Sequence, residues 1–189
     1  MNVTLTWDLI ITVFFVVIMA YSFIVGRHGT AKIIISSYIA MLAANGIAQL
    51  VSLYVPLQSL VSAWSTTPEQ NVVLLKIFLF ILLTLVLVMK GAFLVDTGFE
   101  QSIIIRFITT SVYGFLSAGL IISTILVFMS GPSGGVLASN ISPAFDVSNA
   151  SLLVRSLVNY YSFWFAAPAV AFIISSLIAR VEMPVADES

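Results

Sequence analysis

The side chains that could do chemistry in this chain are few, and each has a plain structural alternative. Residues 131–134 read GPSG, the G-x-S-G pattern of intramembrane serine proteases. A serine nucleophile needs a general base within hydrogen-bond reach, and His28 is the only histidine in the chain. The expected topology puts His28 on the other side of the membrane, and the motif lies in a loop. We therefore predict that the protein is not an enzyme.

Metal and cofactor sites are not predicted either. A single histidine with no nearby carboxylate makes a poor metal site. The chain contains no cysteine, which removes thiolate ligands, thiol catalysis and disulfides. There is no Gly-rich phosphate loop. The net charge of −1 offers no basic face for nucleic acid, which we exclude as a partner.

The remaining polar candidates lie inside apolar stretches. Asn45 and Gln49, one helical turn apart, could line a polar path at mid-membrane depth. Hydrogen bonding between helices is the interpretation we favour. Lys76 and Lys90 are far enough apart, about 21 Å of helix rise, for both to extend their stems to an interface. No apolar run holds an Asp or Glu near its centre, which proton-driven transporters usually need.

Composition fixes the environment in which these residues must be placed. The chain has 189 residues, of which 60% are hydrophobic and 8% charged, whereas soluble domains carry about 25% charged residues. Water is absent from the bilayer core, so each long apolar run must be helical to satisfy its own backbone. Five runs are long enough to cross a core of ~30 Å: residues 8–26, 33–55, 72–95, 103–129 and 152–179.

The predicted fold is an all-α, polytopic membrane helix bundle with about five transmembrane helices and one or two interfacial helices. Apolar residues at helical spacing predict an interfacial helix over residues 57–66, anchored by Trp64. Residues 150–163 are expected to begin as a second interfacial helix before the chain turns into the membrane. Residues 1–180 form a single domain, and residues 181–189 form an acidic cytoplasmic tail.

The distribution of basic residues predicts the orientation, because Lys and Arg near helix ends accumulate on the cytoplasmic side. With five spans, Lys76 and Arg155 lie on one side. The other side carries five basic residues, which places the N-terminus outside and the C-terminus in the cytoplasm. His28 lies beside the first two of them at headgroup level. These five residues are Arg27, Lys32, Lys90, Arg106 and Arg180.

Three segments carry a family resemblance: WDLIITVFFVVIMAYSFIVGRHGTAKIIISSYIAMLAANG, RFITTSVYGFLSAGLIISTILVF and ISPAFDVSNASLLVRSLVNYY. These segments resemble parts of the colicin V production proteins. The first resembles that family's first helix, its basic turn and the small-residue helix that follows. The second resembles its helix that begins with Arg and contains glycine, and the third resembles its closing Pro-containing stretch. The resemblance covers most of residues 7–163 and implies a bacterial inner-membrane protein in export or envelope maintenance. The chain departs from the family in its Gly-Arg-His-Gly turn and in FWFAAPAVAFIISSLIA, which looks like an added span.

Two rows of small residues are the candidate interaction surfaces. Small side chains let membrane helices approach closely, and residues spaced by four stay on one face. The rows are expected to pack against each other or to build an oligomer seam, so cysteines at positions 44 and 114 should cross-link. Export or envelope maintenance through such contacts is the first hypothesis, an accessory subunit of a larger membrane complex the second, and a small-solute channel or transporter the third. The rows are Ala40, Ala44 and Ala48 on the second predicted helix, and Gly114 and Ala118 on the fourth.

Overall fold

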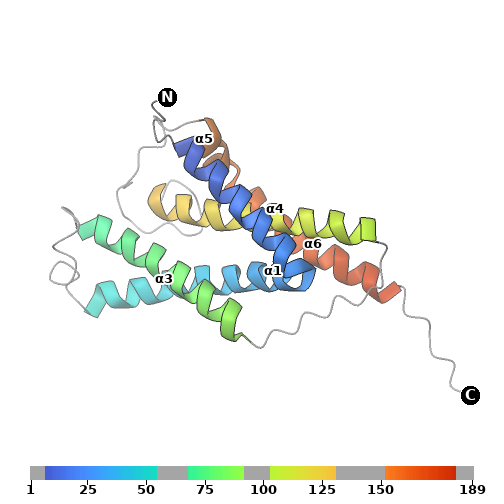
Figure 1. Cartoon of the computed structure of the whole chain (residues 1–189). Coiled ribbons are helices and arrows are strands. Elements are labelled where there is room, and N and C mark those ends of the chain that lie inside the picture. The colour runs from blue at the N-terminus through green and yellow to red at the C-terminus, as the bar shows by residue number, and fades with distance from the viewer. Residues whose placement is uncertain (1–6, 55–67, 92–102, 131–151, 182–189) are drawn as a thin grey trace, which may run out of the picture.

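The computed structural model describes residues 7–54, 68–91, 103–130 and 152–181, and within these ranges the chain is almost wholly helical, without a β-strand (Figure 1). The predicted all-α class is confirmed for these ranges. Three helices are long and apolar enough to cross a membrane, or four if α5 and α6 count as one bent span, which indicates membrane association. The helices are α1 (Trp7–Tyr54), α3 (Pro68–Lys90), α4 (Ile103–Ser130), α5 (Leu152–Asn159) and α6 (Tyr161–Val181).

Helix α1 takes in the first two predicted helices and is broken once, at Gly26. Its 48 residues correspond to about 72 Å of rise, more than twice a bilayer core. Gly26 has φ 75° and ψ −176°, a conformation that is essentially restricted to glycine. The chain bends sharply there, and the first half of α1 (residues 7–25) and the second half (residues 27–54) run in different directions (Figure 1). The predicted turn of several residues is thus reduced to one.

Thr30 lies at the break in α1 and its hydroxyl is close to carbonyl groups on both sides of it. A broken helix leaves carbonyl groups without their usual N–H partners. The Thr30 hydroxyl donates to the carbonyl of Gly26 at 2.9 Å, and its oxygen lies 3.5 Å from the carbonyl oxygen of Ser22. Thr30 and Ser22 are both fully buried. The break is therefore an ordered part of the packing.

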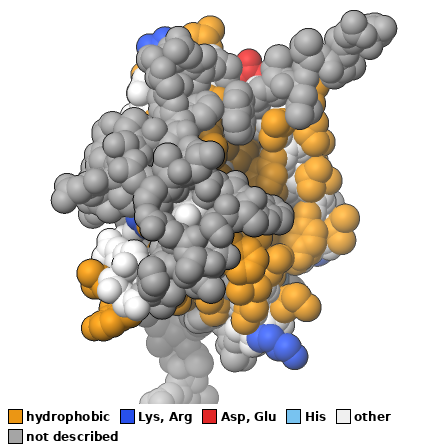
Figure 2. Space-filling view, turned by 90° about the vertical axis from the view of Figure 1, so that its left-hand side faces the viewer, with side chains coloured by type: hydrophobic (Ala, Val, Ile, Leu, Met, Phe, Trp, Pro, Cys, Tyr) orange, Lys and Arg blue, Asp and Glu red, His pale blue; other side chains and the backbone are white. Residues whose placement is uncertain are grey.

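Helix α4 is the centre of the bundle. Both halves of α1 and helix α6 pack on α4, while α3 packs chiefly on α1. In the most apolar stretch of α4, 72% of the residues are buried, against 17% in α3. Hydrophobic side chains cover much of the described outer surface in view in Figure 2, and many large apolar residues are exposed. Such a surface suits a hydrocarbon environment.

The contacts along α4 define the direction of each neighbour. The first half of α1 runs antiparallel to α4, since Ile11 packs in one cluster with Ile122, and the Phe23 ring stacks 5.1 Å from that of Phe107. The second half runs parallel to α4. Its Ile34 shares a cluster with Tyr113, and its Met41 sulfur lies 3.8 Å from the hydroxyl of Thr124.

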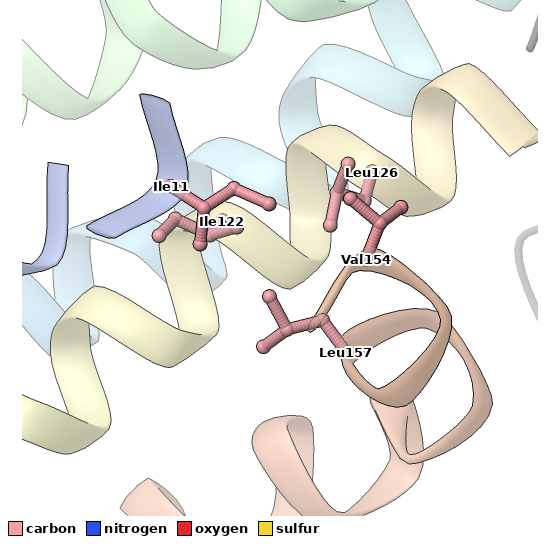
Figure 3. Packing of buried hydrophobic residues seen from close by; sticks show 5 residues of the cluster. All are labelled: Ile11, Ile122, Leu126, Val154 and Leu157. Carbon is pink, nitrogen blue, oxygen red and sulfur yellow. The ribbon is translucent and has the colours of Figure 1, made fainter. Parts of the chain in front are cut away.

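Helices α5 and α6 close the other side of α4. Helix α6 runs antiparallel to α4, and α5 is bent by 62° from it. On α5, Val154 and Leu157 are buried against Ile11, Ile122 and Leu126 (Figure 3). The short α5 lies within the range expected to start as an interfacial helix. The expected helix over 57–66, with Trp64, lies outside the described residues, as do GPSG and 182–189.

Candidate functional site

The alanine row of α1 is buried inside the chain. Ala40, Ala44 and Ala48 have no exposed surface. Ala40 and Ala44 form one cluster with Phe80 of α3 and Phe128 of α4, whose rings meet edge to face with centroids 6.1 Å apart. Small side chains on α1 thus make room for large aromatic rings from two neighbouring helices.

The second row meets a different partner from the one expected. A Cβ atom added to Gly114 would lie 2.9 Å from the Cβ of Ser22 and 3.2 Å from the sulfur of Met19, both in the first half of α1. Ala118, one turn on, is fully buried. The two rows therefore do not pack on each other, because the alanine row meets α4 nearer its C-terminal end. Both rows are used within one chain, which leaves any oligomer seam to other surfaces.

Gly119 is a packing position that the sequence analysis did not single out. A Cβ atom added there would overlap the indole ring of Trp164 on α6. The same ring lies 5.4 Å from Phe115 and 6.1 Å from Phe15, measured between centroids. Gly119 follows Gly114 on the central helix, and that repetition of the smallest residue was the available signal.

Two tyrosines fasten α6 to the bundle and were also missed. The Tyr38 hydroxyl donates to the carbonyl of Phe165, and the Tyr113 hydroxyl donates to the carbonyl of Ala171 at 3.4 Å. Pro168 lies between these two carbonyls, inside α6. Proline removes a helix hydrogen bond and crowds the preceding turn, and neighbouring helices commonly supply polar groups where this happens in a membrane. The carbonyl that Pro168 leaves without its helix partner is that of Trp164, so the tyrosines bond to carbonyls on either side of the proline and do not replace the lost bond itself.

Small hydroxyl residues line the buried centre. Ser117 donates to the carbonyl of Gly114 at 2.9 Å, and Thr124 donates to that of Leu120 at 2.8 Å. Both bonds remain within α4, so each of these two hydroxyls donates to a backbone carbonyl of its own helix. Such residues keep the packing close without requiring a polar partner from another helix.

Asn45 and Gln49 lie in different environments. Asn45 is half-buried, and its side-chain oxygen is enclosed without a hydrogen-bond partner among the described residues. Gln49 is exposed on the outer surface of α1. The two residues are one helical turn apart, but their side chains do not line a common polar path.

Some of the residues assigned to headgroup level are exposed and others are buried. His28 and Arg106 are exposed and Lys32 is half-buried. Arg27 is only 8% exposed, so most of its side chain is enclosed by the protein and not at headgroup level as expected. The expectation of an interface-exposed Lys76 needs correction, because this side chain is only 4% exposed. The packing of α3 against α1 supplies cover that a helix considered alone does not have.

A groove between the first half of α1 and the α5–α6 bend is a large hollow lined by described residues. Its volume is about 980 Å³, at the upper end of the range common for small-molecule sites. The aromatic rings of Phe15, Phe115 and Trp164 lie together in its wall. The lining is almost entirely apolar, so the groove suits hydrocarbon and not a charged solute.

Comparison with known proteins gives no match: no protein-family model, curated protein or solved structure is similar to this chain. The resemblance to colicin V production proteins therefore stays a prediction, and the arguments about function rest on the packing.

Proposed function

We propose that the chain is a five-span bacterial inner-membrane protein with its N-terminus outside and its C-terminus in the cytoplasm. It acts through helix packing and assembly in export or envelope maintenance, without a catalytic centre. The two halves of α1 are its first two spans, α3 and α4 the next two, and α5 with α6 the last.

The direction of the helices around α4 is the observation that carries this proposal. In a five-span chain, the first and fifth spans run opposite to the fourth, and the second runs with it. The first half of α1 is antiparallel to α4 through Phe23 and Phe107, whereas the second half is parallel. Helix α6 is antiparallel, since Trp164 lies against Gly119 and Ala171 against Tyr113. All three directions agree with five alternating crossings.

The type of role follows from what the centre is made of. Helix α4 is enclosed by close contacts of small residues, with no charged side chain among its buried residues in the described part of the chain. Such a centre supports a rigid body that presents apolar outer faces to lipid or to other membrane proteins. The resemblance to colicin V production proteins supplies export or envelope maintenance as the cellular setting.

An accessory subunit of a larger membrane complex is the second candidate. The exposed apolar side of α3, with Phe78, Leu82 and Val86, favours it, because this helix has neighbours mainly on its α1 side. A small-solute channel has less support, because Asn45 and Gln49 do not face a common space.

Reporter fusions test the topology. A fusion after Ser189 should report the cytoplasm, and a fusion within residues 135–145 should report the outside. A cytoplasmic signal from the second fusion would contradict the five-span proposal. Purification in mild detergent separates the roles: a stable homo-oligomer favours the first candidate, and foreign membrane subunits that remain bound favour the second. Deletion should reduce export of a secreted peptide or sensitise cells to envelope stress under the first candidate.

A further inference from the structure

We propose that the interface between the second half of α1 and helix α3 binds a water molecule, which joins the hydroxyl groups of Ser36 and Thr84. The proposal needs only that these helices lie in a membrane. It goes beyond the proposed role, because it requires neither an export function nor an oligomer.

The hydroxyl oxygens at this interface are enclosed and have no hydrogen-bond partner among the described residues. Ser36 and Ser37 are 0% and 1% exposed, and Thr84 is half-buried with its Oγ1 atom enclosed. Helical hydroxyls often donate to a carbonyl in the preceding turn, as Ser117 and Thr124 do. The first three hydroxyls do not use that partner. An enclosed polar group without a partner is costly, and in proteins such groups commonly bind ordered water.

Spacing and direction bring Ser36 and Thr84 to the same level of the bundle. Ala40 and Phe80 pack in one cluster. Ser36 lies one helical turn before Ala40, and Thr84 lies one turn after Phe80, so each shares a face with its neighbour. Helix α3 begins on the side where α1 ends, so the two helices run in opposite directions (Figure 1). A turn back along α1 and a turn forward along α3 therefore lead from the Ala40–Phe80 contact to the same place.

The surroundings of the two hydroxyls suit a neutral ligand that both donates and accepts hydrogen bonds. Ser36 lies ten residues beyond the break at Gly26, about 15 Å of rise, which is half of a ~30 Å hydrocarbon core. A bound water needs two to four polar partners. Ser36 and Thr84 supply two, and the hydroxyl of Ser37 is the next along α1. A hydroxyl group both donates and accepts, so water satisfies each of them.

The water would give the edge helix a polar attachment. Helix α3 packs chiefly on α1, and Thr84 is its one hydroxyl residue. Apolar contacts gain little in lipid, whereas hydrogen bonds between helices contribute to their association. The bridge from Thr84 to Ser36 is therefore expected to help to hold α3 in place.

The test uses the full chain in nanodiscs and a brief X-ray pulse, which converts bound water into hydroxyl radicals that oxidise the side chains beside it. Phe80 is only 1% exposed and should be oxidised because it lies one turn from Thr84. Tyr113, 2% exposed and in another cluster, is the internal control and should stay unmodified. In Ser36→Ala and in the isosteric Thr84→Val, oxidation of Phe80 should fall several-fold. Thr124→Val removes a hydroxyl that bonds within its own helix and should leave the oxidation of Phe80 unchanged.

The double variant Ser36→Ala, Thr84→Val separates a water bridge from other arrangements. Since either change releases a shared water, the double variant should lower the unfolding midpoint in dodecyl sulfate no further than the more harmful single change. Circular dichroism spectra check that every variant is folded. An unmodified Phe80 in the unaltered chain, or equal oxidation of Tyr113, would overturn the proposal. Losses that simply add would also overturn it, because each hydroxyl would then act alone. Coupled losses without oxidation of Phe80 would do the same, because the two hydroxyls would then bond to each other directly.

Discussion

Helix α4 and helix α3 are both apolar enough to cross a membrane, but one is enclosed by the protein and the other lies at its edge. The enclosed helix is the less apolar of the two by hydropathy. Helix α4 contains two glycines, one alanine, four serines and three threonines. Helix α3 contains no glycine or alanine, and Thr84 is its only hydroxyl residue.

The difference shows what drives packing when the solvent is hydrocarbon. Lipid chains are as apolar as leucine, so a large apolar side chain gains little by leaving lipid for protein. Small residues gain more, because they allow backbones to approach and many weak contacts to form at once. Helix α4 combines buried large residues such as Leu120 and Phe128 with the small residues that let its neighbours approach, and α3 has almost no small residues.

The register of the contacts on α4 allows an all-or-none test of this comparison. Ser22→Cys with Gly114→Cys should form a disulfide readily, because a Cβ at 114 would lie 2.9 Å from that of residue 22, and a small separation of the two helices brings the pair to the ~3.8 Å that a disulfide needs. Ala44→Cys with Gly114→Cys should form none. Met41 already lies at Thr124, so residue 44 is about 15 Å or more from Gly114 along α4, beyond the ~7 Å Cα separation that a disulfide spans. Gel mobility without reductant reads out both pairs in this cysteine-free chain. A strong 44–114 product would contradict the register.

Replacing a small residue on α4 should have the largest effect on stability. In Gly119→Leu the new side chain must displace the Trp164 ring, and we expect a loss of about 3 kcal/mol or more. Val86→Leu on the exposed side of α3, where the side chain is 48% exposed, should change stability by less than about 0.5 kcal/mol. Unfolding in mixed micelles with increasing dodecyl sulfate measures both. Equal losses would show that α3 is as enclosed as α4.

The break in α1 should have the next largest effect. Gly26→Ala forces a Cβ into the positive-φ conformation at this position, at a cost of about 1–3 kcal/mol. Gly46→Ala is the control in the same helix, because nothing lies near its added Cβ and its φ is not positive. It should be neutral or stabilising by up to about 1 kcal/mol. If Gly26→Ala is as mild as Gly46→Ala, the first half of α1 does not depend on this conformation for its packing on α4.

Much of the fold was predictable from sequence because apolar run length and backbone satisfaction in lipid are local properties. They predict α4 to within one residue and α3 with its bounds shifted by four or five residues, and the basic residues after Gly26 mark the position of the break. The sharpness of that break was not predictable, since one residue, Gly26, takes up the whole bend with φ 75° and ψ −176°.

The close-packing positions were predictable from the sequence, but the residues that they contact were not. Spacing identifies Ala44 and Gly114 as close-packing positions. It cannot say that Gly114 meets Ser22 while Ala44 meets Phe80 and Phe128, because register depends on how three helices fit together. The same limit applies to Lys76, whose burial is created by a neighbouring helix.

The smallest effects should come from the two tyrosines that hold α6, and they extend the comparison to a third helix. Tyr38→Phe removes a bond to the carbonyl of Phe165, and hydrogen bonds between membrane helices contribute about 0.6 kcal/mol on average and up to about 1.7. We expect a loss of about 1 kcal/mol. Tyr113→Phe should cost less, because its bond to the carbonyl of Ala171 is long, at 3.4 Å. Tyr21→Phe, at an exposed position (45%), is the control and should cost almost nothing.

The double variant Tyr38→Phe, Tyr113→Phe then separates two explanations. If α6 is held by the bonds on either side of Pro168 acting together, the combined loss should exceed the sum of the single losses, since either bond alone keeps the segment in place. If apolar contacts such as Trp164 against Gly119 hold α6 and the bonds are incidental, the losses should add and stay near those of Tyr21→Phe. Micelle unfolding curves of the four proteins decide between them. The second outcome would place α6 with α4 as a helix fixed by close packing alone.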